Sequence, residues 1–145
     1  MDVNLYYHYQ VQLIYLGLEE SHALNVFLGV STEDSGSDPA LENKKAAIAF
    51  IYMNIKVGLI QAPAWQANAH ATWTEDEIYE FLDTTPSSQI NKSIEWFTTY
   101  FEGTEKLVEL LKRHGLYGWE HYNGPPNIAF QQELLAIYRE HGFDV

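Results

Sequence analysis

The sequence predicts an all-α fold, a compact bundle of about six to seven helices that forms one domain over residues 1–145. Apolar residues recur at helical spacing through the C-terminal two-thirds of the chain. Most of these stretches begin with a capping residue and end at a glycine, which is how helices are usually bounded. A chain of 145 residues, of which 46% are hydrophobic, is also large enough to bury one core without a disulfide or a metal.

The N-terminal segment fits two interpretations. Apolar and polar residues alternate through residues 3–15, which is typical of a strand. We favour a helix, because a strand of that length is uncommon and no hairpin turn follows it. Residues 23–30 carry the same ambiguity. If both segments are strands, the fold is α+β with a β-hairpin formed by residues 3–30. The helical stripe of the first segment consists of Tyr6, Tyr9, Leu13 and Leu16.

The next predicted helix begins at Pro39 and ends at Gly58. Asp38 is suited to cap it, and proline is well tolerated at the first helical position. Its middle is apolar on every face, which predicts the central, buried helix of the domain.

A short helix follows Thr74 and ends near Asp83. Thr74 and Glu77 have the spacing of a capping box, and Trp73 and Ile78 occupy the two positions of a hydrophobic staple. The apolar stripe of this helix is predicted to face inward, which leaves its acidic side chains outward.

Three further helices are predicted by the same rules. The aromatic-rich loop at residues 117–126 separates the last two. Its rings either cover the end of the domain or serve as interface anchors. The capping residue and the terminating glycine of the three helices are Thr85 and Gly103, Thr104 and Gly115, and Asn127 and Gly142.

Charge is the strongest functional signal. Twenty Asp and Glu stand against eight Lys and Arg, a formal net charge of −12. Residues 1–43 and 57–91 contain acids but no Lys or Arg. Such a surface repels nucleic acid and anionic lipid and attracts cationic proteins. We therefore expect a basic protein partner, and neither nucleic acid nor membrane. The alternative is that the acidity only keeps the protein dispersed.

Two groups of residues are the candidate partner-binding site. The first lies on a polar loop before the central helix, and the second on the short acidic helix, where Tyr79 projects between carboxylates and Trp73 sits at the entry. Aromatic side chains amid acids suit a Lys- and Arg-rich surface. Alternatively, Glu75 to Glu77 serve only the helix cap and dipole. The predicted site comprises Glu33, Asp34, Asp38, Trp73, Glu75, Asp76, Glu77, Tyr79, Glu80 and Asp83.

Motifs for catalysis or cofactors are not apparent, so we predict neither an enzyme nor a bound cofactor or metal. The chain has no cysteine, its six histidines lack the spacing of metal ligands, and it contains no serine-nucleophile or phosphate-loop motif. An enzyme whose site is assembled from distant residues is the alternative. A pocket that gathers two or more of five side chains would favour it: His70, His114, Glu120, His121 and Glu133.

We also expect a cytoplasmic location. The N-terminus lacks the basic region and cleavage site of a secretory signal. The longest apolar run, residues 46–53, is far shorter than the ~20 residues of a membrane span.

The amphipathic stretch at residues 47–60, the acidic balance, the absence of cysteine and the short helix caps together resemble a known class. This class is the small acidic immunity proteins of bacterial contact-dependent and polymorphic toxin systems. The resemblance is in general character and assigns no residue roles. It implies a non-enzymatic inhibitor, made beside its toxin, that binds a basic, often nuclease, toxin domain. A further alternative is a DNA mimic or anti-defence protein, which would need its acids in a regular double row.

Overall fold

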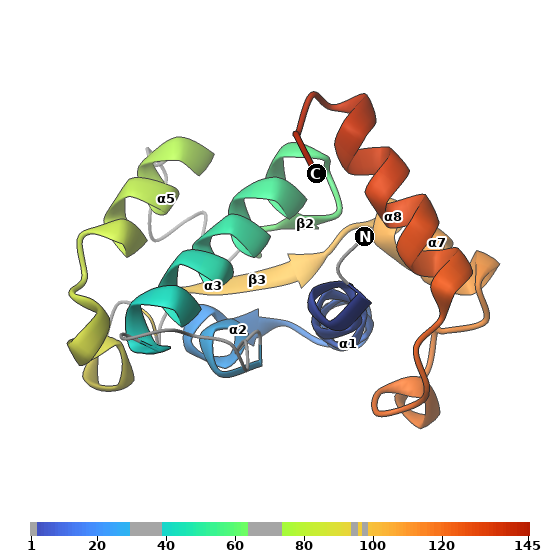
Figure 1. The fold of residues 1–145 in the computed structure, drawn as a ribbon, viewed down its shortest axis with the longest axis horizontal. Helices are drawn as coiled ribbons and strands as arrows, with labels where there is room; N and C mark the ends of the chain where they lie inside the picture. The colour runs from blue at the N-terminus through green and yellow to red at the C-terminus, as the bar shows by residue number, and fades with distance from the viewer. Residues whose placement is uncertain (1–2, 30–38, 64–73, 94–95, 97–98) are drawn as a thin grey trace.

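The computed structural model describes residues 3–29, 39–63, 74–93, 96 and 99–145. Within these residues the chain forms six α-helices, two 3-10 helices and a small sheet of three short strands. The predicted mostly helical fold is therefore confirmed. Helix α5 lies at one end of the molecule and helices α7 and α8 at the other, with α3 and the sheet between them (Figure 1).

The N-terminal segments are helical. Helix α1 spans Val3–Leu18 and helix α2 spans Ala23–Gly29. The stripe of tyrosines and leucines on α1 is buried, which explains why the helical interpretation is correct where the alternation of residues suggested a strand. Only Ser21–His22 between the two helices is extended, as strand β1.

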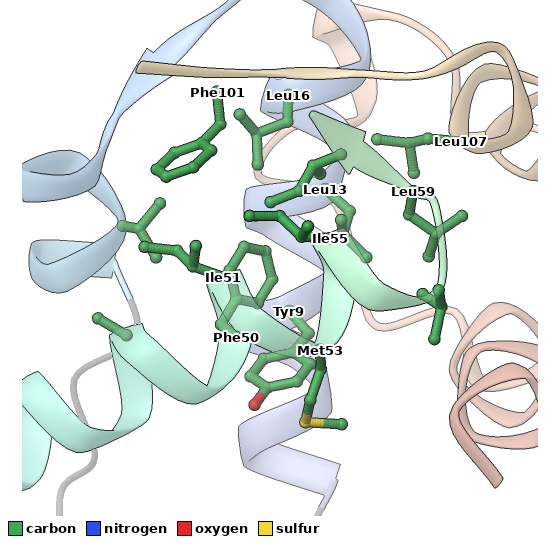
Figure 2. Close-up of a cluster of buried hydrophobic side chains, with 14 of the residues drawn as sticks. Tyr9, Leu13, Leu16, Phe50, Ile51, Met53, Ile55, Leu59, Phe101 and Leu107 are labelled. Carbon is green, nitrogen blue, oxygen red and sulfur yellow. The ribbon is translucent and has the colours of Figure 1, made fainter. Parts of the chain in front are cut away.

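Helix α3, Pro39–Lys56, forms the centre of the core. Gly58 follows it with a φ of +78°, a left-handed conformation that glycine adopts without strain, so the predicted helix end is confirmed. Figure 2 shows α3 packing against α1 and the sheet. The buried side chains labelled in Figure 2 are Tyr9, Leu13, Leu16, Phe50, Ile51, Met53, Ile55, Leu59, Phe101 and Leu107.

Neither α3 nor any other helix in the described residues has the length and apolar character that a membrane crossing requires.

The sheet corrects one predicted element. Where one helix up to Gly103 was expected, the structure has a 3-10 helix at Ser87–Lys92, a helical residue at Trp96 and strand β3 at Tyr100–Gly103. Strand β3 is central and pairs antiparallel with β1 and with β2, Ile60–Gln61. Aromatic residues favour strands, and Phe101 is fully buried where it pairs with Ser21.

Gly103 was predicted to end a helix, but in the structure it allows close packing. A side chain there would bring its Cβ within 2.7 Å of the Leu16 carbonyl oxygen, so only glycine lets β3 approach the end of α1 this closely.

The remaining helices begin at the predicted caps. Helix α5 spans Glu75–Asp83, α7 spans Glu105–Arg113 and α8 spans Ile128–Glu140. A side-chain oxygen of the residue before each helix accepts a backbone hydrogen bond from its first turn, from Glu77, Leu107 and Phe130 respectively. The capping residues are Thr74, Thr104 and Asn127.

Hydrogen bonds of buried polar side chains fix the positions of α1, α3 and α8 relative to one another. Asn54 donates to the Phe50 carbonyl oxygen at 2.7 Å and accepts a hydrogen bond from the Tyr138 hydroxyl at 2.8 Å. Gln10 accepts from the Asn127 backbone N–H at 2.8 Å and donates to the Pro125 carbonyl oxygen at 3.1 Å. These bonds join α3 to α8, and α1 to the loop before α8.

Candidate protein-interaction surface

Helix α5 presents a mixed acidic and aromatic stripe. Asp76, Tyr79, Glu80 and Asp83 have i, i+3, i+4 and i+7 spacing, which places them on one helix face. The apolar side chains of the helix are buried against the core, among them Ile78 and Leu82. The three carboxylates are exposed and the tyrosine is half-buried. The outward orientation predicted for these acids is therefore confirmed.

Two of the acids on this stripe pair with lysines of α3. Lys56 Nζ lies 3.2 Å from Asp76 Oδ1, and Lys44 Nζ lies 3.6 Å from Asp83 Oδ1. Lys44 also donates a 2.6 Å hydrogen bond to the Asp83 backbone carbonyl oxygen, and its side chain is only 10% exposed. The two lysines therefore hold both ends of α5 against α3.

Among the α5 side chains that the structure describes, Glu77 and Glu80 are the acids without a lysine partner. Both are exposed, and no Lys or Arg among the described residues forms an ion pair with either. A carboxylate without a local cation keeps its full attraction for a cation on another molecule.

An apolar hollow of about 370 Å³ adjoins the acidic stripe between α3 and α5. The ring of Tyr79 from α5 lies 5.0 Å, between centroids, from the ring of Tyr52 on α3. The ring of Phe143, from the C-terminal segment, lies 6.0 Å from that of Tyr52 on another side. Further lining comes from Lys45, Ile48, Ala49, Met53 and Asp83.

The Tyr79 ring of this hollow stays neutral. Burial raises the pKa of Tyr79 above its ordinary value, and the nearby Asp83 carboxylate and Tyr52 raise it further. Lys56 Nζ lies over the Tyr52 ring, 5.6 Å from its centroid, a cation–π contact. The hollow therefore has aromatic walls and a charged rim.

The structure brings together only part of the predicted site. Asp76, Glu77, Tyr79, Glu80 and Asp83 share one short helix, as expected. Glu75 begins that helix, but its side chain lies outside the described part of the structure. Four predicted residues also lie outside the described residues: Glu33, Asp34, Asp38 and Trp73.

Two acids of the first cation-free block form a region apart from α5. Glu19 and Glu20 follow α1 and line a shallow hollow with Glu102 of β3. Glu105 and Glu109, on α7 beside this region, are also exposed. Glu42 of that first block lies instead on α3, where it pairs with Lys45, and lysines from outside the blocks pair with two of the acids on α5.

Sequence reasoning missed the contribution of α3 to this surface. The sequence predicts a helix that is buried on every face here, yet Tyr52 is half-buried and Ala49 is exposed. The lysines at positions 44 and 56 flank the apolar run of residues 46–53, and their spacing does not identify α5 as the neighbour that they contact.

A second hollow of about 370 Å³ gathers two of the histidines that would favour an enzyme. His114 and His121 both line it. Each contacts a carboxylate: His114 Nε2 lies 3.1 Å from Glu133 Oε1, and His121 Nε2 lies 3.5 Å from Glu120 Oε1. The described residues contain no group of three or more side chains that suits a metal ion. The remaining histidine of that set, His70, lies outside the described residues.

The rings of the loop at residues 117–126 divide between the core and the surface. Tyr122 is half-buried against the core, whereas Tyr117 and Trp119 are 41% and 49% exposed. Trp119 contacts Tyr15 of α1 edge-on, with ring centroids 5.3 Å apart. The loop therefore covers the end of the domain and still presents an aromatic edge to solvent.

Comparison with known proteins finds no family model, curated protein or solved structure that matches the chain. A proposal on function therefore depends on the exposed face of α5 and the adjoining edge of α3.

Proposed function

We propose that this chain binds a cationic protein through the outward face of α5 and the adjoining edge of α3. The observation that carries the proposal is the stripe of α5, in which carboxylates flank the half-buried Tyr79 beside an apolar hollow. Aromatic anchors at the centre of a charged rim are the usual composition of a protein-binding hot spot.

Electrostatics supports a cationic partner. The formal net charge of −12 steers positively charged proteins toward the chain from a distance, and Glu77 and Glu80 attract them at close range. The pairs made by Lys44 and Lys56 orient Asp76 and Asp83, so the partner meets a surface that is already arranged. Such preorganisation lowers the entropic cost of binding.

The biological role that best fits this chemistry is that of an immunity protein. In this proposal the chain binds a basic toxin domain, a nuclease in the form that the resemblance implies, and neutralises it in the bacterial cytoplasm by protein–protein contact.

Site-specific photo-crosslinking tests the proposal, because it captures a partner whose identity is not yet established. The photoreactive residue p-benzoylphenylalanine is placed at Glu80 on α5 in one variant and at Gln132 on α8 in a matched control. Both positions are exposed and helical, and the helices that carry them, α5 and α8, lie at opposite ends of the molecule (Figure 1). We expect position 80, and not position 132, to capture one basic protein in the producing cell, and the purified pair to reassociate.

The proposal fails if position 80 captures nothing beyond what position 132 captures, or if the captured protein is not basic. If the captured protein is basic, a toxicity assay separates the immunity role from other binding roles. Co-expression of the chain must then restore growth, and the Glu77→Lys/Glu80→Lys variant must restore it less.

One observation favours a second candidate, an enzyme. His114 and His121 share a hollow, and Glu133 contacts His114, an arrangement that suits proton transfer. Replacing both histidines by glutamine separates the candidates, because the binding role on α5 is unaffected by these changes whereas a catalytic role at this hollow is lost. Loss of the cellular phenotype in the double variant would favour the enzyme.

A further inference from the structure

The lining of the hollow between α3 and α5 is mostly apolar. Ile48, Ala49 and Met53 come from α3, and the rings of Tyr52, Tyr79 and Phe143 form walls around them. Its volume of about 370 Å³ lies near the lower end of the range of ligand clefts, roughly 300–1,000 Å³. This size suits a side chain better than a large cofactor.

The aromatic walls are accessible from solvent. Tyr52, Tyr79 and Phe143 are all half-buried, and Ala49 is exposed at the base of the hollow. Half-buried aromatic rings around one hollow gain most when an apolar group displaces the water between them.

The charged side chains around the hollow differ in whether an ion pair already offsets their charge. Asp83 lies at the α5 edge, where Lys44 Nζ is 3.6 Å from its Oδ1 and offsets its charge, and Glu80 precedes it by one helical turn on the same face. Lys45 lies at the α3 edge, where its Nζ is 3.9 Å from Glu42 Oε1, so a carboxylate already offsets its charge. The rim therefore presents net negative charge to an incoming chain.

From this juxtaposition we infer that the hollow takes one large apolar side chain of the partner, presented between Lys or Arg residues. The inference rests on the proposed function and adds to it the chemistry of the segment that is recognised. Charge complementarity places the basic residues over Glu80, which has no lysine partner among the described residues, and the apolar side chain enters between Tyr52 and Tyr79. Recognition then depends on an anchor as well as on charge.

Two synthetic peptides test this inference directly. Both are short and rich in Lys and Arg, and they differ only at one central position, which is Leu in one and Ser in the other. Binding to the full chain is measured by fluorescence anisotropy at several salt concentrations. We expect the Leu peptide to bind about tenfold more tightly, a factor that corresponds to about 1.4 kcal/mol. Backbone NMR shifts at Tyr52 and Tyr79 locate the bound peptide.

A pair of matched variants shows whether the hollow is responsible. Ala49→Gln fills the hollow without a change of charge, whereas Ala136→Gln makes the same change at an exposed position within α8. Both alanines are exposed and helical, so the fold is expected to tolerate glutamine. In Ala49→Gln the two peptides should bind equally, and in Ala136→Gln the Leu preference should persist.

The outcomes distinguish this inference from the function on which it rests. Equal binding of the two peptides to the unmodified chain, with affinity that falls as salt rises, overturns the anchor and leaves the cationic partner standing. A Leu preference that survives in Ala49→Gln also overturns it. If neither peptide binds in a salt-dependent way, or if Glu77→Lys/Glu80→Lys leaves peptide binding unchanged, the proposed function itself fails.

Discussion

Glu133 shows how a single side chain links two helices of this molecule. It lies on α8, where one carboxylate oxygen bonds to Arg113 and the other lies 3.1 Å from His114 Nε2, both at the end of α7. Cations are favoured at a helix C-terminus, and the position of Arg113 and His114 there was apparent from the sequence. Their shared partner, Glu133, was not apparent from the sequence, because twenty residues separate it from Arg113.

This contact predicts a pH-dependent stability. Burial alone raises the pKa of Glu133, but hydrogen bonds from Arg113 and His114 outweigh it and hold the pKa below its ordinary value of 4.5. A depressed pKa in the folded state stabilises the protein above the unfolded value, and the contribution is lost as the pH falls through the folded value. We therefore expect Glu133→Gln to lower the free energy of unfolding above about pH 5.

Urea denaturation between pH 3 and pH 7 measures this effect. The difference between the variant and the unmodified protein should shrink as the pH falls below 4.5, the ordinary pKa of the carboxyl. Glu140→Gln, an exposed position on the same helix, is the control and should show no such trend. A Glu133→Gln difference that stays constant across this pH range would contradict the account.

At the scale of elements, prediction from the sequence succeeded where the cause is local. The starts of α5, α7 and α8 depend on a capping side chain one residue before the helix, and all three caps form as expected. The strand at Tyr100–Gly103 was missed because pairing with residues 21–22 and 60–61 determines it. Local periodicity contains no information on partners so distant in the chain.

The cap of α5 provides a test at this scale. Thr74→Ala removes the oxygen that accepts the Glu77 N–H at 3.2 Å, and loss of such a cap costs about 1 kcal/mol. Since α5 is short, we expect faster amide hydrogen exchange in residues 77–83 and weaker binding of a basic partner. Thr74→Ser keeps the hydroxyl and should restore both. Unchanged exchange in α5 would show that packing against α3, not the cap, sets its stability.

For the whole molecule, the sequence predicted the excess of negative charge but not its arrangement. Acid-only blocks of sequence do not become acid-only surfaces, because α3 brings Lys44 and Lys56 to the two ends of α5. The proposed partner surface consequently reduces to the middle of α5 and the hollow beside it. The half of that surface contributed by α3 was not predictable, since it depends on how two helices pack and not on either helix alone.

The most direct test of this account is the rate at which the basic protein captured at position 80 associates with two charge-reversed variants. Glu77→Lys/Glu80→Lys reverses charge on α5, and Glu105→Lys/Glu109→Lys makes the same net change on α7 with exposed acids. At low salt we expect the α5 variant to associate about tenfold more slowly than the α7 variant, and the gap to close as salt screens the charges. Equal rates for the two variants at low salt would mean that only total charge matters, and would contradict a binding site on α5.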